Sequence, residues 1–122
     1  MRDRRLSPGA VGVAALLLIL AGCSRPGSSI LGQAPAGSPV SLDTARNAAV
    51  GSSVTVEAEM VEKCPEAGCW FILKDGTGTL RVDTKTAGFV VLDVPLHHRL
   101  SVSGQMVTNG SEKLLAATGV RY

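Results

Sequence analysis

Short stretches in which apolar and polar residues alternate, separated by tight turns, most limit what this 122-residue chain can fold into. Residues 54–60 alternate with a period of two, as half-buried strands do, and residues 99–107 repeat the pattern. Asp75-Gly76 and Asn109-Gly110 favour hairpins, because these residues tolerate positive φ values. The pattern predicts a small domain made mainly of β-strands.

Five strands are expected, over residues 54–60, 69–73, 79–83, 99–107 and 113–122. Three precede a looser connection over residues 84–95 and two follow it, which predicts a five-stranded OB-fold-like Greek-key barrel. An SH3-like barrel is the alternative. Gly104 is expected to provide a bend or bulge in a coiled strand. The expected core comprises Val54, Val56, Ile72, Leu80, Val82, Leu100 and Val102.

A short helix is expected before the barrel. Ser41 can accept backbone N–H groups as the N-cap, and Gly51 is placed to end the helix after about nine residues. One face would carry Leu42, Ala45, Ala49 and Val50. Because so short a helix is unstable alone, it must pack on the barrel.

The first 22 residues have the composition of an export signal. Three arginines precede an apolar run over residues 11–20, which is shorter than the roughly 20 residues that span a bilayer. The sequence LAGC ending at Cys23 resembles a bacterial lipobox. The resemblance implies a lipoprotein signal peptide over residues 1–22 and acyl chains such as palmitate on Cys23. An ordinary secretory signal or a short anchor is the alternative.

Export as a lipoprotein implies a cellular location and a division of the chain into domains. Ser24 follows the cysteine, so the aspartate retention signal is absent and a Gram-negative host would place the protein in the outer membrane, facing the periplasm. Residues 23–40 are rich in Gly, Ser, Pro and Ala, which predicts a flexible tether. The OB-fold-like domain is then expected over residues 41–122.

Removal of the signal also changes the charge. Of the 12 Lys and Arg residues three lie in residues 1–22, and one of the 10 Asp and Glu residues does, so residues 23–122 carry nine of each. The mature chain is neutral and has only four aromatic residues. Nucleic-acid binding by an OB-fold needs basic residues beside several exposed aromatics, so nucleic acid is not an expected partner.

The central stretch carries a family resemblance. GSSVTVEAEMV (residues 51–61) and CPEAGCWFILKDGTGTLRV (residues 64–82) resemble the small exported bacterial OB-fold proteins grouped as the domain of unknown function DUF4920. Its distinctive part is C-x4-C-W followed by L-x-D-G-x-G. The resemblance covers roughly residues 41–107 and implies an exported OB-like protein. It implies no activity and no role for His97 and His98.

Cys64 and Cys69 flank the loop expected between the first two strands. Two cysteines across a four-residue hairpin loop can face each other at a separation that a disulfide requires. Lipoproteins act outside the reducing cytosol, so a structural Cys64–Cys69 bridge is expected. The chain-entropy estimate for so small a loop is about 2 kcal/mol.

Two other chemistries compete with a structural disulfide. A metal site could use Cys64 and Cys69 with His97 or His98 to bind Cu or Zn, which accept thiolate and imidazole ligands. A reversible thiol pair is also possible, because small strained loops hold reducible disulfides. However, the spacing is not that of thioredoxin, and no sequence feature predicts a lowered thiol pKa.

The ligand face of an OB-fold lies over its second and third strands, here on either side of the DGTG turn. Trp70 is expected to fill the core, which leaves Phe71 as the exposed aromatic beside Lys74 and Arg81. These three residues are the predicted ligand contacts. The two cations suit an anionic ligand.

No grouping of residues typical of a catalytic site is present in the sequence, and the DGTG turn is not followed by the helix of a phosphate-binding loop. The sequence therefore predicts a non-enzymatic cell-envelope lipoprotein that binds or assembles with a partner. The expected partners are the membrane, through the lipid, and an envelope protein or small ligand. No cofactor is expected; a metal-handling protein using Cu or Zn, or a thiol-redox accessory protein, is the alternative.

Overall fold

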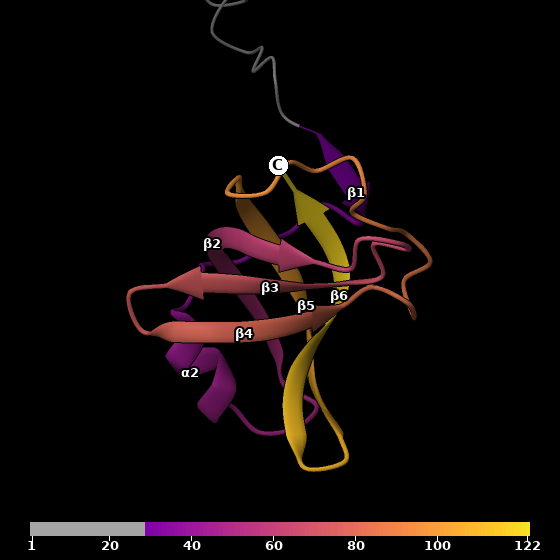
Figure 1. Ribbon diagram of the computed structural model, residues 1–122. Helices are drawn as coiled ribbons and strands as arrows, with labels where there is room; N and C mark the ends of the chain where they lie inside the picture. Colours follow the sequence, from indigo (N-terminus) through magenta and orange to yellow (C-terminus); the bar gives the residue numbers. More distant parts are fainter. Residues whose placement is uncertain (1–28) are drawn as a thin grey trace, which may run out of the picture.

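The computed structural model describes residues 29–122 (Figure 1), so the predicted signal peptide and Cys23 lie outside the described residues. The elements are β1 (Ile30–Gly32), α2 (Leu42–Asn47), β2 (Ser53–Lys63), β3 (Trp70–Asp75), β4 (Gly78–Asp83), β5 (Arg99–Asn109) and β6 (Glu112–Arg121). Within the described part of the chain, no helix has the length and apolar character needed to cross a membrane.

Strands β2 to β6 close into a barrel. β2 pairs with β3 and β5, β3 pairs with β4, and β6 closes the ring by pairing with β4 and β5. The β4–β6 pairing is parallel and the other four are antiparallel. The predicted five-stranded OB-fold-like Greek-key barrel with a short N-terminal helix is therefore confirmed.

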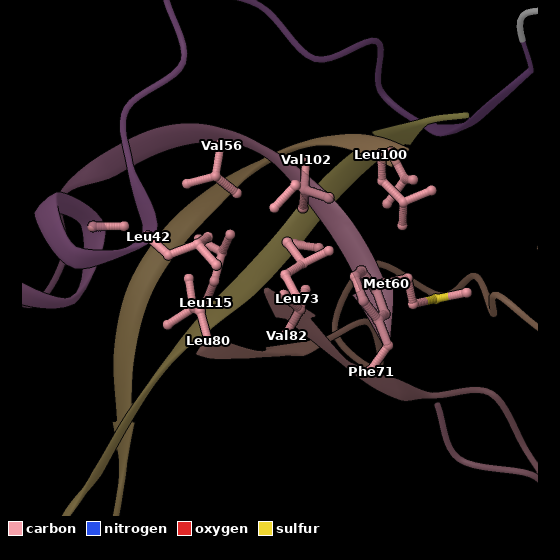
Figure 2. Packing of buried hydrophobic residues seen from close by; sticks show 14 of the residues in the cluster. Leu42, Val56, Met60, Phe71, Leu73, Leu80, Val82, Leu100, Val102 and Leu115 are labelled. Atoms are coloured by element: carbon pink, nitrogen blue, oxygen red, sulfur yellow. The ribbon is translucent and has the colours of Figure 1, made fainter. Parts of the chain in front are cut away.

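One apolar core fills this barrel (Figure 2). It contains Val56, Met60, Phe71, Leu73, Leu80, Val82, Leu100, Val102, Met106, Leu115 and the helix residues Leu42 and Ala45, among others. The predicted core is confirmed on β4 and β5 but is wrong on β3. Phe71 and Leu73 are buried, whereas Ile72 and Trp70 are half-buried on the outer side. Val54 is also only half-buried.

The register of the β3–β4 hairpin explains this inversion. Asp75 pairs with Gly78, so only two residues form the turn, and Phe71 and Leu73 face Val82 and Leu80. The same register places Ile72 opposite Arg81. Since Arg81 belongs to the outer face, its neighbour on β3 must lie there too.

Helix α2 is shorter than expected. Ser41 is its N-cap, as predicted, and its side chain accepts the Thr44 N–H at 3.1 Å. The helix ends at Asn47, before Gly51, so Ala49 and Val50 are exposed rather than packed on the barrel. The sequence pattern overestimated the helix because only the first turn has a surface to pack against.

The DGTG turn docks on the start of α2. The Asp75 carboxylate accepts the Leu42 N–H at 2.9 Å, and the Thr77 hydroxyl accepts the Asp43 N–H at 3.0 Å. Burial would raise the pKa of Asp75, but hydrogen bonds from the Thr77 side chain and from backbone N–H groups, Leu42 included, outweigh it and lower the pKa. The motif therefore joins the hairpin to the helix.

Residues 30–40 are part of the fold, so the prediction of a flexible tether over residues 23–40 is wrong from Ile30 onward. β1 pairs with β6, with Ile30 opposite Arg121. Val40 then bridges to Val56 on β2. Composition did not show this, because a three-residue strand added to a barrel needs no strong apolar pattern of its own.

Gly104 allows β5 and β6 to approach closely. The pairing shifts register between Ser103 and Gly104, which confirms the predicted bulge. A Cβ atom at Gly104 would lie 2.1 Å from the Ala116 carbonyl oxygen. No larger residue fits there without moving the backbone.

Figure 1 distinguishes two ends of the barrel. The helix end consists of α2, the β3–β4 turn and the tip of the β5–β6 hairpin. The loop end consists of β1, the β2–β3 loop (residues 64–69) and the connection between β4 and β5 (residues 84–98). That connection has no helix or strand, as predicted.

A lysine closes each end. Lys63 donates to the carbonyls of Val91, Leu92 and Val94 in the loop-end connection, the Leu92 bond being 2.8 Å long. Lys113 donates to the carbonyls of Arg46, at 2.9 Å, and Ala48, at the end of α2. Both ammonium groups therefore satisfy carbonyls that have no partner in a regular helix or strand.

Candidate binding face and cysteine loop

The outer face of β3 and β4 presents the one tryptophan of the chain beside a cation. The Arg81 guanidinium lies over the Trp70 ring at 4.9 Å from its centroid. Ile72 pairs with Arg81, and Lys74 continues the same face as an exposed side chain. Stacking of this kind holds a guanidinium in a fixed plane while leaving its edge free to bind an anion.

Arg81 has bonding capacity that the fold does not use. Its Nε is buried and has no hydrogen-bond partner among the described residues. None of the ion pairs formed within residues 29–122 uses Arg81 or Lys74. A buried donor without an acceptor is costly, and a ligand oxygen would remove the cost.

The three predicted ligand contacts are therefore only partly brought together. Lys74 and Arg81 share the outer face, as predicted. Phe71 is fully buried and points into the core beside Met60 (Figure 2), so its prediction as an exposed ligand contact is wrong. The aromatic surface of this face belongs to Trp70.

The cysteine loop does not have the geometry expected of it. Lys63 pairs with Phe71, and the Cys64 N–H donates to the Trp70 carbonyl at 3.1 Å, so Trp70 and not Cys69 lies opposite Cys64. Cys69 belongs to the other side of the loop, where its carbonyl accepts the Thr84 N–H. Both cysteines are free, half-buried thiols in this structure. The disulfide remains a prediction.

The loop surrounds the Cys64 sulfur with backbone donors. Hydrogen bonding from Ala67, and then from Glu66 and Gly68, lowers the pKa of Cys64, while burial opposes it weakly. The Ala67 N–H lies 3.5 Å from the sulfur. The expectation that no feature lowers a thiol pKa is therefore wrong, because a tight turn can aim N–H groups at a thiolate without a helix.

The two histidines lie away from the cysteines. His97 has a left-handed backbone (φ 68°) and its Nδ1 lies 2.7 Å from Glu59 Oε2, while the His98 ring contacts Tyr122 edge-on. Both exchange backbone hydrogen bonds with Met60, four residues before Cys64 on β2. Four residues of strand span about 13 Å, too far for one ion with ligands about 2 Å away.

Consistent with this spacing, no three His, Cys, Asp or Glu side chains within residues 29–122 are arranged to hold a metal ion. The ligand set of the metal-binding alternative, Cys64 and Cys69 with His97 or His98, is not assembled. His97 instead pairs with a carboxylate across the β2–β5 surface.

A groove of about 480 Å³ lies on the opposite side of the barrel, between residues 33–40 and strands β2 and β5. Three of its hydroxyl groups, those of Thr55, Ser103 and Thr118, are already hydrogen-bonded within the fold. The Thr55 and Ser103 hydroxyls lie 2.7 Å apart, and Ser103 Oγ accepts the Ala36 N–H at 3.2 Å. These bonds hold the N-terminal segment against the barrel, and the groove carries no charged side chain.

Sequence reasoning missed three important side chains: Trp70 as the outer-face aromatic and the lysines at the two barrel ends. The position of Trp70 could have been predicted from the turn. A two-residue turn at Gly76-Thr77 pairs Ile72 with Arg81, so Trp70, two residues from Ile72, lies on the same outer face as Arg81. No sequence signal identified the carbonyl partners of Lys63 and Lys113. Those partners come from segments 28 to 67 residues away.

No protein-family model and no curated protein matches the chain. A similar solved structure is that of the hypothetical protein ygiW from E. coli, with a TM-score of 0.56 over 70% of this chain and 90% of that chain. The two sequences are 18% identical, so the similarity concerns the fold alone.

Proposed function

We propose that this protein is a non-enzymatic lipoprotein of the cell envelope whose barrel binds an anionic partner on the outer face of β3 and β4. The observation that carries the proposal is Arg81, which lies over Trp70 with a buried Nε that has no partner among the described residues. Lys74 extends the cationic face. The recognised group is a carboxylate or similar anion on an envelope protein or small ligand.

The envelope location rests on the sequence. The lipobox-like LAGC and the apolar run before it support export and lipid attachment at Cys23. A Gram-negative host would place the protein on the outer membrane, facing the periplasm.

Intrinsic fluorescence tests the binding face directly, because Trp70 is the only tryptophan. We expect a short poly-glutamate peptide, used as the probe, to change the fluorescence of the full chain in a saturable way. Arg81→Gln should weaken the apparent affinity about 10-fold or more, as expected for losing one charged hydrogen bond.

Arg99→Gln is the matched control, because Arg99 is an exposed arginine on β5 that pairs with Glu57, outside the face. The control should bind the peptide as the unaltered chain does. An absence of saturable change in the unaltered chain, or equal losses in both variants, would refute an anion-binding role for Arg81.

A second function is supported by the Cys64 turn. A thiol-redox accessory protein would use the Cys64 thiolate, which the loop N–H groups stabilise, to attack a disulfide of a partner protein. Attack forms a mixed disulfide and releases one partner thiolate. Cys69 then attacks Cys64, which releases the second partner thiolate and leaves Cys64–Cys69 oxidised and the partner reduced.

Thiol titration of the protein purified from the envelope, together with metal analysis, distinguishes a structural Cys64–Cys69 disulfide from a redox-active pair. An oxidised, metal-free Cys64–Cys69 pair that ordinary cellular reductants do not open supports a structural disulfide. A pair found partly reduced supports redox exchange. Free thiols with stoichiometric Cu or Zn would refute both and favour metal handling.

If the bridge is structural, Cys64→Ser combined with Cys69→Ser should cost about 2 kcal/mol of unfolding free energy and leave the protein folded. The barrel core contains neither cysteine, so it retains its packing. Urea unfolding measures the loss. Complete unfolding of the double variant would show that the loop, and not the core, determines the fold.

A further inference from the structure

Exposed apolar side chains gather at one end of the barrel. Five large apolar residues of the described chain are exposed, and four of them lie at the loop end: Ile30, Val90, Leu92 and Leu96, exposed by 48%, 46%, 42% and 46%. We call these four the apolar rim. The fifth, Val50, is 58% exposed and follows α2 at the helix end.

Contacts within the loop end hold together the segments that carry the rim. Phe89, next to Val90, packs against Gly32 of β1, and Leu92 packs against Gly68 of the β2–β3 loop. Leu96 precedes the two histidines, and the His98 ring contacts Tyr122, which exchanges backbone hydrogen bonds with Ser29. Figure 1 shows the connection passing from β4 to β1 and the C-terminus before it enters β5.

The covalent distance to Cys23 is short. Five residues lie between Cys23 and Ser29, the first described residue, and no chain exceeds about 3.6 Å per residue, so Ser29 is at most about 22 Å from Cys23. A small domain is about 30 Å across. A tether this short, joined at the loop end, keeps the loop end within about 22 Å of the anchor and so favours contact of this end with the bilayer.

We propose that the apolar rim rests on the lipid surface to which Cys23 is anchored, so that the barrel has a fixed orientation and the β3–β4 face is presented to the periplasm. This inference rests on the lipid attachment of the proposed function. Apolar side chains of interfacial segments enter the boundary between headgroups and acyl chains by about 5–10 Å. Because the lipid on Cys23 keeps the barrel next to the bilayer, the rim has a high effective concentration at the lipid surface, and a small contact area is enough for binding.

The contact is apolar rather than electrostatic. The loop end carries Lys85 and Arg121 as well as the exposed Glu66 and Asp93, so these positive and negative charges offset each other. Contact with the bilayer should therefore change little with salt, unlike the binding of a basic patch to anionic lipids.

Quenching by brominated acyl chains tests the orientation. The lipidated full chain is reconstituted in vesicles of phosphatidylethanolamine and phosphatidylglycerol, with Trp70→Phe to remove the native signal. Leu96→Trp is compared with Val50→Trp as the matched control. Because the rim should reach the acyl boundary, we expect brominated lipids to reduce the Leu96→Trp fluorescence about twofold or more and to leave Val50→Trp unchanged.

Equal quenching at the two positions, or none for Leu96→Trp, would overturn the inference. Val90→Trp is the second rim variant and must behave as Leu96→Trp does, which keeps the test decisive if one variant misfolds. The mass of the N-terminal peptide and flotation of the vesicles report lipid attachment separately. A chain with lipid on Cys23 but an unquenched rim refutes the orientation alone, and a chain without lipid refutes the envelope anchor as well.

Discussion

A lysine side chain closes each end of the barrel, but the two ends differ in the other contacts that hold them together. At the helix end, Lys113 binds the carbonyls that end α2, while Asp75 and Arg46 add further bonds between the helix and the β3–β4 hairpin. At the loop end, Lys63 alone among the described side chains binds the carbonyls of residues 91–94. The helix end is thus fixed by bonds from several side chains, whereas at the loop end one lysine supplies the side-chain bonds to residues 91–94 and the other hydrogen bonds of that segment join backbone groups.

The two ends also differ in the kinds of residue that they present. The helix end has a regular helix, a capped terminus and one exposed apolar side chain. The loop end has the cysteines, the histidines and the apolar rim. An end built from irregular segments can present backbone donors and apolar groups that a helix would satisfy internally.

The largest expected difference comes from removing the two cations. Lys63→Met should lower the unfolding free energy by about 3 kcal/mol, because it removes the side-chain donor of the Leu92 and Val94 carbonyls. Lys113→Met should cost about 1 kcal/mol, since Asp75 and Arg46 still hold the helix. Urea unfolding of the two variants measures both values. Equal costs would show that the ends are equally supported.

The second difference concerns two loop glycines. Gly68→Ala should cost about 2 kcal/mol, because Gly68 has a φ of 63° and a Cβ atom would lie 2.9 Å from the Leu92 backbone nitrogen. Gly76→Ala, in the β3–β4 turn, meets no atom within 4 Å and should change stability by less than about 0.5 kcal/mol. Thermal unfolding compares them. A neutral Gly68→Ala would mean that the cysteine loop is not held against residue 92.

The third prediction is a pH effect at the helix end. The folded-state pKa of Asp75 is below that of the unfolded chain, so the carboxylate stabilises the fold above about pH 4, and this contribution is lost as the pH falls further. Asp75→Ala should cost about 1 kcal/mol at neutral pH, as for the loss of a helix cap. Unfolding measured between about pH 6 and pH 2 tests both statements.

In that experiment Asp75→Asn keeps the side-chain shape without the charge. It should therefore show a smaller decrease in stability on acidification than the unaltered chain. An unchanged acid dependence would assign the pH effect to other carboxylates.

The smallest expected effect is on thiol reactivity at the loop end. In the reduced protein, alkylation by iodoacetamide should show a component whose midpoint lies below the ordinary thiol pKa of about 8.5, because backbone N–H groups lower the pKa of Cys64. Cys64→Ser should remove this component, and Cys69→Ser should retain it. Retention of the component in Cys64→Ser would show that the turn does not stabilise its thiolate.

The barrel was predictable because its signals are local. Alternation in β2 and β5, and two tight turns, define four of the strands, and three strands before a long connection with two after it define the topology. The N-cap at Ser41 and the bulge at Gly104 were found for the same reason. Each depends on residues close together in the sequence.

The errors arose where local signals were ambiguous. Strand β3 has apolar residues on both faces, so alternation could not say whether Trp70 or Phe71 lies inside, and only its pairing with β4 decides. Residues 30–40 look like a linker by composition, yet they are fixed by β6, about 90 residues later. The structure consequently places Lys74 and Arg81 on one outer face, as predicted, but puts Trp70 there in place of Phe71.

The pairing of β1 with β6 has a consequence for the order in which the chain matures. Ile30 reaches its place only opposite Arg121, about 90 residues later, so the first strand among the described residues to be synthesised is the last to be fixed. Until β6 has been made, β1 has no partner strand, whereas the β3–β4 hairpin forms between neighbouring residues. The segment that begins the described fold is therefore also its latest addition.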